Sequence, residues 1–347
     1  MSRLGFLVPG ALDQPTGGYR YDARMIAGLR EQGWRVELRE LEGQFPGPDA
    51  RAEQALEEAL AGFPDGMRVL LDGLAAGASP AVLRRHAARL QLVYLMHHPL
   101  GLEAGLAPAR SQALLEAERA AVALASRVVV TSDYTRAQAA DWGVPSERLC
   151  SILPGVESAP LARGPEDGVP VLLCVAAWVP RKGQLELVRA LSGLRERSWR
   201  AELAGAMDRD PDYTASVRDA IAEGGLEARI SAPGVLTHEG LGKLYDQASI
   251  FVLPSVYEGF GMAFAEAMMR GLPVIGTTGG AIPHTVPEAA GLLVPPDDVE
   301  ALRQALESLL CDPEQCRRMG RAGRAHAESL PDWTEGARRL AQWLEAV

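Results

Sequence analysis

Two glutamates in residues 249–276 carry the clearest chemical signal in the sequence. Glu258 lies in a glycine-containing loop that follows a short buried apolar strand ended by Pro254, so we expect it at the mouth of a cleft. Glu266 falls about one turn inside the helix predicted from Met262 to Arg270. A carboxylate in that place can accept both hydroxyls of a ribose. We therefore read the pair as sugar-binding groups rather than as two solvated glutamates.

The residues between these glutamates add an anion-binding element. Backbone N–H groups at the start of a helix, together with the helix dipole, suit an anion or a sugar oxygen. We expect this role for Gly259, Phe260, Gly261 and Met262. The same glycines partly mimic the dinucleotide fingerprint, but its third glycine is replaced by Phe264 and no acidic residue follows at the expected distance. A nicotinamide cofactor, and with it a dehydrogenase, is disfavoured.

A second candidate site is the segment VAAWVPRKG, residues 175–183, between a predicted strand and a predicted helix. Arg181 and Lys182 project from this loop. Two fixed cations beside a helix N-terminus can hold a diphosphate and neutralise the charge that grows on it as a leaving group. The alternative is a solvated pair in a turn.

Two further groups follow strands in the first half of the chain. Gly17 and Gly18 open a helix after the first strand, where adjacent glycines let the backbone approach a phosphate or sugar closely. His97 follows the strand that ends at Met96 and is a candidate substrate contact. We expect no metal site there, since no further ligand falls at obvious spacing. The Asp-x-Asp motif at Asp208 is expected to be a polar turn.

The elements that must position these residues alternate between short apolar strands and amphipathic helices, which predicts parallel α/β sheets. A turn-rich stretch at 158–170 separates two such series. We predict two doubly wound domains facing a central cleft, in which ligands gather at the carboxyl ends of the strands. The expected parts are a first domain at 1–160, a second domain at 161–330 and a C-terminal packing helix at 331–347.

Composition sets the class of protein. The 347 residues are 47% hydrophobic and 23% charged, the balance of a folded globular chain with about two domains. The net charge of −10 argues against a broad grip on nucleic acid. Four cysteines without metal-ligand spacing predict free thiols in a reducing compartment. With no window of 18 uninterrupted apolar residues, we expect a cytoplasmic protein whose membrane contact, if any, is peripheral at the inner face.

These segments, in this order, resemble retaining glycosyltransferases of family 4, which have the GT-B fold. The resemblance runs through most of the chain, and the glutamate pair in its PS-x-x-EG-x-G context is the most specific mark. It also includes TGGYRYDARMIAGLREQGWRVELREL, LVYLMHHPL, TSDYTRAQAADWGVPSERLCSILPGVE, VPRKGQLELVRAL, GLPVIGTTGG and GLLVPPDD.

The resemblance implies a role for each matching residue. Glu258 would contact hydroxyls of the donor sugar and Glu266 the ribose. Lys182 would bind the diphosphate, and Gly17 and Gly18 would approach it from the first domain. His97 would lie beside the donor sugar. The resemblance also implies that 1–160 is the acceptor-side domain, that 161–330 is the nucleotide-sugar-binding domain, and that the helix at 331–347 packs back on the first domain.

Two departures from the family pattern stand out. Ala176 and Ala177 occupy the stretch where many relatives have a diphosphate-binding arginine, and Arg181 is the candidate replacement. The family's Gly-Gly-x-x-Glu loop is here the stretch from Gly279 to His284, which lacks the acidic residue and leaves the identity of the donor sugar open.

The reaction implied is transfer of a sugar from a nucleotide diphosphate sugar to an acceptor hydroxyl with retention, without a metal or other cofactor and by front-face attack. The acceptor could be a lipid carrier, a polysaccharide or a small molecule. Two alternatives remain at this point. One is a sugar-nucleotide epimerase of the same fold, and the other is a non-catalytic sugar-nucleotide-binding protein.

Overall fold

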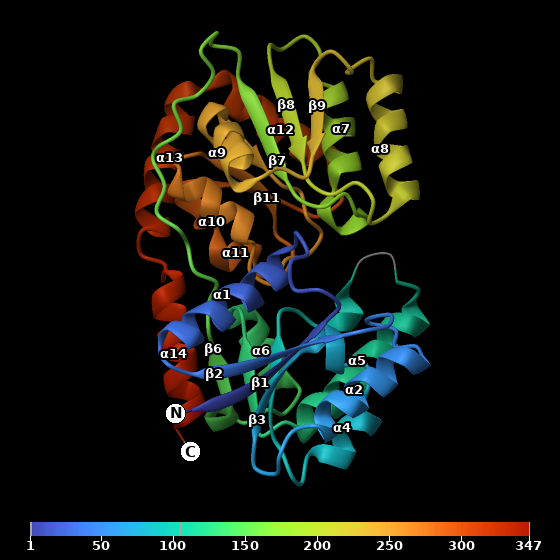
Figure 1. The fold of residues 1–347 in the computed structure, drawn as a ribbon. Coiled ribbons are helices and arrows are strands. Elements are labelled where there is room, and N and C mark those ends of the chain that lie inside the picture. Colours follow the sequence, from blue (N-terminus) through green and yellow to red (C-terminus); the bar gives the residue numbers. More distant parts are fainter. Residues whose placement is uncertain (1, 104–105, 347) are drawn as a thin grey trace. The chain divides into compact units, whose positions relative to one another are not determined.

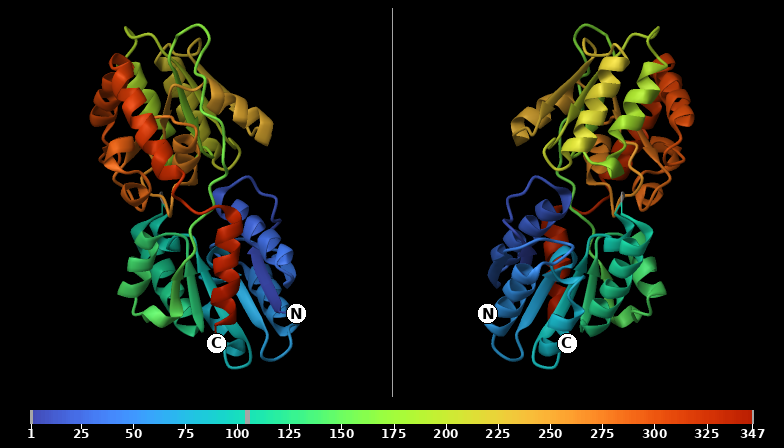
Figure 2. Two further views of the ribbon diagram at one scale, coloured as in Figure 1. Left: turned by 90° about the vertical axis from the view of Figure 1, so that its left-hand side faces the viewer. Right: turned by 90° about the vertical axis from the view of Figure 1, so that its right-hand side faces the viewer.

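The computed structural model describes residues 2–103 and 106–346, and the chain divides into two compact units (Figure 1). Unit 1 consists of Met1–Gly155 and Pro331–Val347, and unit 2 of Val156–Leu330. Each unit is a six-stranded, fully parallel sheet with helices on both faces (Figure 2). The predicted pair of Rossmann-like GT-B domains is thereby confirmed.

The division falls between Gly155 and Val156, a few residues before the predicted boundary at 160/161. The turn-rich stretch belongs to unit 2 because its backbone is hydrogen-bonded there. Ala162 N donates to Arg270 O at 2.9 Å, and Gly164 N donates to Asp246 O at 2.9 Å. These bonds satisfy backbone groups of a segment that has no secondary structure of its own.

Unit 1 has the strand order β2-β1-β3-β4-β5-β6. Most of its strands are near-continuous apolar runs, as expected for parallel strands covered on both faces, whereas the edge strand at 35–41 contains several charged residues. The strands are β1 (Arg3–Pro9), β2 (Arg35–Leu41), β3 (Arg68–Asp72), β4 (Gln91–Met96), β5 (Arg127–Val130) and β6 (Leu149–Ser151). The helices are α1 (Gly17–Glu31), α2 (Ala50–Ala61), α3 (Gly73–Ala76), α4 (Pro80–His86), α5 (Pro108–Leu124), α6 (Asp133–Asp141) and α14 (Trp333–Glu345).

Helix α14 returns to unit 1 and packs against α1 (Figures 1 and 2). Trp333, Ala337, Leu340 and Leu344 are buried at helical spacing and form its packing face. The predicted return of the C-terminal helix to the first domain is confirmed.

Unit 2 has the strand order β12-β11-β10-β7-β8-β9. Its strands are β7 (Val171–Val175), β8 (Arg200–Ala204), β9 (Ile230–Gly234), β10 (Ile250–Val252), β11 (Val274–Thr277) and β12 (Gly291–Val294). Its helices are α7 (Gln184–Ser192), α8 (Pro211–Glu223), α9 (His238–Gln247), α10 (Met262–Met269), α11 (Ile282–Thr285), α12 (Val299–Cys311) and α13 (Pro313–Ala327).

The strand order of each sheet reverses at one point, between β1 and β3 in unit 1 and between β10 and β7 in unit 2. In open parallel sheets the loops at the carboxyl ends of the strands flanking such a reversal diverge and leave room for a ligand. Apart from His97, which follows β4 next to β3, the sequence-predicted site residues come after β1, β7 or β10. Among the described helices, none combines the length and apolar content needed to cross a membrane.

Candidate functional site

The loop after β7 carries the two cations of unit 2. Pro180–Lys182 forms one turn of 3-10 helix, and Gly183 (φ 72°) turns the chain into α7. A Cβ on Gly183 would collide with Pro254 O in the loop after β10, so the close approach of the two loops requires glycine. Two hydrogen bonds of 2.8 Å join the same loops. Val256 N donates to Arg181 O, and Arg181 Nη1 donates to Tyr257 O.

Glu258 lies against both cations and is 8% exposed. Its Oε1 accepts hydrogen bonds from Lys182 Nζ at 2.6 Å and from Ser255 Oγ at 2.6 Å. Its Oε2 lies 3.8 Å from Arg181 Nη1. Burial alone would raise the pKa of Glu258, but the charges of Lys182 and Arg181 and the two hydrogen bonds hold it below its usual value. The carboxylate is therefore ionised.

Lys182 is unusual for this protein. It is one of two lysines in a chain with 35 lysines and arginines, and the other, Lys243, is on the surface. An ammonium is a compact charge with three donors, unlike the planar guanidinium that the chain uses elsewhere. With Arg181 and Glu258, Lys182 gives the cluster a net charge of about +1, which suits an anionic ligand.

A third loop supports Glu258 from the side of β11. Ala281 N donates to Glu258 O at 2.8 Å, and Gly280 (φ 60°) packs so closely that a Cβ there would collide with the same oxygen. Thr277 Oγ1 donates to Ser255 O and accepts from Gly279 N. The two glycines hold the loop that bears Glu258. His284, at the end of the stretch that lacks the family's acidic residue, is exposed on α11.

Helix α10 begins at Met262, directly after Gly261 (φ 91°), as predicted. Phe260 is buried, and its carbonyl accepts a hydrogen bond from Thr285 Oγ1. Glu266 is half-buried on α10, and its Oε2 accepts from Tyr245 Oη of α9 at 3.1 Å. The two predicted glutamates therefore have different settings, since Glu258 pairs with cations and Glu266 with a phenol.

In unit 1 the structure brings Gly18 and His97 together. A Cβ on Gly18 would lie 3.5 Å from His97 Cδ2, so α1 begins against the imidazole. The ring of Tyr21 meets that of His97 edge-on, with centroids 5.3 Å apart. Thr131 Oγ1 donates to His97 O at 3.1 Å. Gly17 is the first residue of the same helix.

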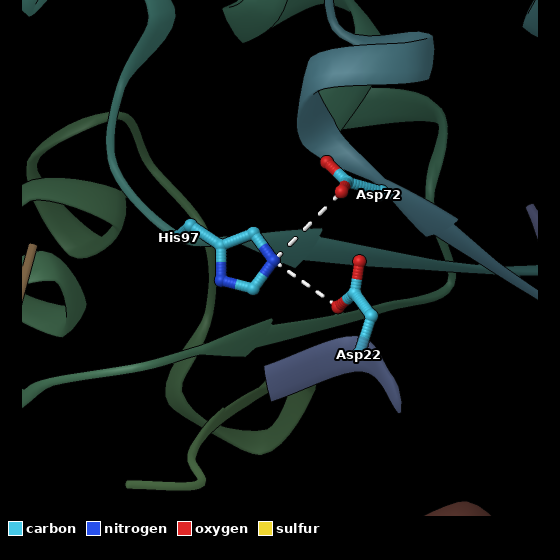
Figure 3. A group of neighbouring side chains, drawn as sticks. All are labelled: Asp22, Asp72 and His97. Carbon is cyan, nitrogen blue, oxygen red and sulfur yellow. Dashed lines mark hydrogen bonds and ion pairs between the residues drawn. The ribbon is translucent and has the colours of Figure 1, made fainter. Parts of the chain in front are cut away.

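Two carboxyl groups that the sequence analysis did not identify face His97 (Figure 3). Asp22 Oδ1 lies 3.2 Å from His97 Nε2, and Asp72 Oδ2 lies 3.9 Å from the same nitrogen. Burial and the neighbouring Asp22 charge raise the pKa of Asp72 to about 8, and burial raises the pKa of Asp22 to about 7. Burial lowers the pKa of His97, partly offset by Asp72. These pKa shifts favour a neutral imidazole on His97 and a proton retained by the Asp22 and Asp72 carboxyl groups.

These three side chains are also a group that could ligate a metal, since their ligating atoms all lie within 4.8 Å of one another. Imidazole with two carboxylates suits zinc or manganese. A cation would have to displace the proton that the carboxyl pair retains. The expectation of a protein without metal stays a prediction.

The remaining motifs have structural roles. Asp210 of the Asp-x-Asp motif caps α8, its side chain accepting from Tyr213 N at 2.9 Å. His98 Nε2 lies 3.1 Å from Glu103 Oε2. All four cysteines are free.

Signals for the missed residues were present in the sequence. Asp22 lies on the apolar stripe of α1 with Met25, Ile26 and Leu29, and a carboxylate at such a position needs partners. Asp72 ends an apolar strand, as His97 nearly does. Ser255 is three residues from Glu258 in one loop.

Comparison with known proteins gives a family match for unit 2. Residues 160–326 match the family model described as "Glycosyl transferases group 1". The chain is 30% identical over 236 residues to a GDP-mannose-dependent alpha-(1-6)-phosphatidylinositol monomannoside mannosyltransferase of Mycolicibacterium smegmatis, covering 62% of this chain and 61% of that protein. It is 32% identical over 181 residues to the MMP alpha-(1->4)-mannosyltransferase of Mycolicibacterium hassiacum, covering 51% and 43%. The matched segments thus span about half of these curated relatives.

Solved structures extend the likeness to the whole described chain. The sucrose-phosphate synthase of Thermosynechococcus elongatus superposes with a TM-score of 0.85 at 24% identity, covering 99% of this chain and 98% of that one. HepE of Anabaena, solved in complex with UDP and glucose, gives a TM-score of 0.77 at 19% identity and covers 100% of both chains. The chain therefore has the fold of these structures, and its second unit matches the glycosyl transferases group 1 family.

Proposed function

We propose that this protein is a retaining family 4 glycosyltransferase that moves a sugar from a nucleotide diphosphate sugar to an acceptor hydroxyl. The observation that carries the proposal is the ionised, buried Glu258 held by Lys182 and Arg181 where the strand order of unit 2 reverses. The group 1 match includes these three residues. GDP-mannose is the first donor to test, because the curated relatives named above include a GDP-mannose-dependent enzyme.

The cations would act on the diphosphate of the donor. Arg181 and Lys182 are fixed by hydrogen bonds to the loop after β10, so they need little reorganisation to receive phosphate oxygens. Their charge would stabilise the nucleoside diphosphate as it leaves. This replaces the Lewis acid of metal-dependent enzymes, and we propose that the reaction is metal-independent.

Glu258 would bind the sugar rather than attack it. Its Oε1 already accepts two hydrogen bonds and its Oε2 faces Arg181, so its negative charge is stabilised and its nucleophilicity is low. An acceptor hydroxyl would then attack from the face that the diphosphate leaves, and the departing phosphate would take its proton. Configuration at the anomeric carbon is retained by this route.

The proposal for the acceptor comes from the names of the curated relatives. The curated relatives act, by their names, on a phosphatidylinositol monomannoside and on MMP. We propose an acceptor with a sugar or polyol hydroxyl, either lipid-linked, with the protein at the inner membrane face, or free in the cytoplasm.

The test combines donor binding with product stereochemistry. Thermal unfolding is measured with GDP-mannose, UDP-glucose and ADP-glucose, because a ligand that binds the folded state raises the melting temperature. Slow donor hydrolysis and transfer to added polyol or mannoside acceptors are followed by NMR, with and without EDTA. We expect stabilisation by one donor, α-linked product and no loss with EDTA. Inverted product, or an epimerised sugar nucleotide formed without acceptor, would overturn the proposal.

A further inference from the structure

The proposed mechanism leaves unused the buried carboxyl pair beside His97. Asp22 comes from α1 and Asp72 from the end of β3, and both face the same edge of the imidazole (Figure 3). Asp22 is 0% exposed and Asp72 is 2% exposed. Two carboxyl groups in such a setting are costly unless each oxygen has a hydrogen-bond partner.

The partners of the four carboxyl oxygens indicate where a proton must lie. Asp72 Oδ1 accepts from Leu74 N at 2.7 Å, and Asp22 Oδ1 faces His97 Nε2. Within residues 2–103 and 106–346, no donor reaches the buried Asp22 Oδ2. The second oxygen of Asp22 lies on the side of the Asp72 carboxyl group (Figure 3), and burial raises the pKa of both groups, so that a proton held by the pair can lie between them. A proton in that place would satisfy the second oxygen of Asp22 and leave Oδ1, which lies 3.2 Å from His97 Nε2, as an acceptor.

An accepting Asp22 Oδ1 determines the tautomer of His97. Nε2 must carry the hydrogen and donate it to Asp22, so Nδ1 carries the lone pair. Nδ1 lies on the side of the ring away from both carboxyl groups (Figure 3), and the His97 side chain is 18% exposed. The close approach of Gly18 and the perpendicular ring of Tyr21 restrict other orientations of the imidazole.

We propose that Asp22 is a positioning residue that holds His97 in the Nε2–H tautomer, so that Nδ1 accepts a hydrogen bond from a hydroxyl of the donor sugar. Asp72 assists by sharing its proton with Asp22. The hydroxyl part of this inference rests on the proposed function, whereas the tautomer does not. In the opposite tautomer Nδ1 would carry the hydrogen and could not accept a hydrogen bond from the sugar hydroxyl.

The test is the nitrogen NMR spectrum of His97 in full-length protein labelled with 15N-histidine, its signals assigned by their loss in His97→Gln. In the wild type we expect a protonated Nε2 and an unprotonated Nδ1. Asp22→Ala removes the acceptor, and we expect averaged tautomers. Asp22→Asn keeps an oxygen acceptor, and we expect it to restore most of the Nε2–H form.

Glu118→Gln is the matched control. Glu118 is another buried carboxyl of unit 1, with its pKa raised to about 8 by burial, but it binds Tyr94 Oη at 3.0 Å and Leu100 N at 2.7 Å. We expect the His97 tautomer to survive this substitution. Unchanged nitrogen shifts in Asp22→Ala, or the same averaging in Glu118→Gln, would overturn the positioning role.

Adding GDP-mannose separates this inference from the proposed function. In the wild type we expect the donor to shift the Nδ1 signal upfield. In Asp22→Ala we expect the shift at the same donor concentration to be at least fivefold smaller. A fixed tautomer with no response to any nucleotide sugar would contradict the sugar contact while leaving the positioning role intact. Loss of both His97 nitrogen signals on addition of micromolar MnCl2 would instead show that Asp22, Asp72 and His97 bind a cation, and would overturn the proposal.

Discussion

Buried carboxyl groups lie at the point of strand reversal in each unit, but their pKa values are shifted in opposite directions. In unit 2, Glu258 is held by Lys182 and Arg181, and its pKa stays below the usual value despite burial. In unit 1, no described cation is paired with Asp22 or Asp72, and the pKa of each rises to about 7 and about 8. Buried carboxyl groups thus carry a fixed negative charge in unit 2 and retain a proton in unit 1. The first suits an anionic diphosphate with its sugar, and the second suits orientation of a neutral imidazole.

The largest expected effect is on the stability of unit 2. Glu258→Gln leaves two partly buried cations without their carboxylate, which we expect to cost about 3 kcal/mol. Hydrogen exchange of peptides covering β10 and β11 measures the loss. Glu239→Gln, which removes the carboxylate 2.7 Å from exposed Lys243 Nζ, should cost less than about 0.5 kcal/mol. Equal losses in the two variants would remove the distinction between the two ion pairs.

Next in size is the effect on turnover. Lys182→Ala removes the compact cation proposed for the diphosphate, and we expect kcat/KM to fall about 100-fold. Lys243→Ala is the control, because it is the only other lysine in the sequence and lies on the surface. Initial rates of donor consumption measure both, with circular dichroism to verify folding. A Lys182→Ala chain with wild-type rates would reject the site.

The pH dependence of stability should differ between the units. Asp72 keeps its proton in the folded state up to about pH 8, whereas the unfolded chain releases it near pH 4, so its contribution to stability is lost as the pH rises through that window. Asp72→Asn cannot lose that proton. We expect it to gain stability relative to the wild type by about 1 kcal/mol for each pH unit between 6 and 8.

Chemical denaturation at several pH values measures this difference. Asp22 and Glu118 also have raised pKa values, so part of the wild-type slope should remain in Asp72→Asn. Parallel slopes for the two proteins would mean that Asp72 is ionised in the folded state at neutral pH. The contrast between the two units would then disappear.

The smallest expected effect concerns Glu266. Tyr245→Phe removes the hydroxyl that donates to Glu266 Oε2, and we expect the KM for the donor to rise about threefold with kcat unchanged. Steady-state kinetics give both constants. A change in kcat without a change in KM would contradict the role of Glu266 in binding the ribose of the donor.

Most strands of each sheet could be predicted from the sequence, but one edge strand of each sheet, β6 in unit 1 and β12 in unit 2, could not. Apolar runs such as Leu92 to Met96 are long enough to be recognised, and the observed strand is Gln91–Met96. Strands β6 and β12 have three and four residues, and such short runs resemble loops. Tertiary pairing with a neighbouring strand, rather than local propensity, makes them strands.

The site was predictable where one loop contains it and not where separate loops meet. Glu258, Lys182 and His97 were identified from their positions after strands. That Lys182 pairs with Glu258 depends on the adjacency of β7 and β10, which are far apart in sequence. Asp22 and His97 are 75 residues apart and meet only because α1 begins beside the end of β4.

The central claim is that the cation and carboxylate cluster of unit 2 binds a nucleotide diphosphate sugar. Lys243→Arg leaves Lys182 as the only lysine, so reductive 13C-methylation gives one lysine side-chain signal, with its charge kept. We expect that signal to shift saturably with GDP-mannose, and to do so less in a Glu258→Gln background. A Lys182 signal that stays fixed with saturating GDP-, UDP- and ADP-sugars would contradict the account.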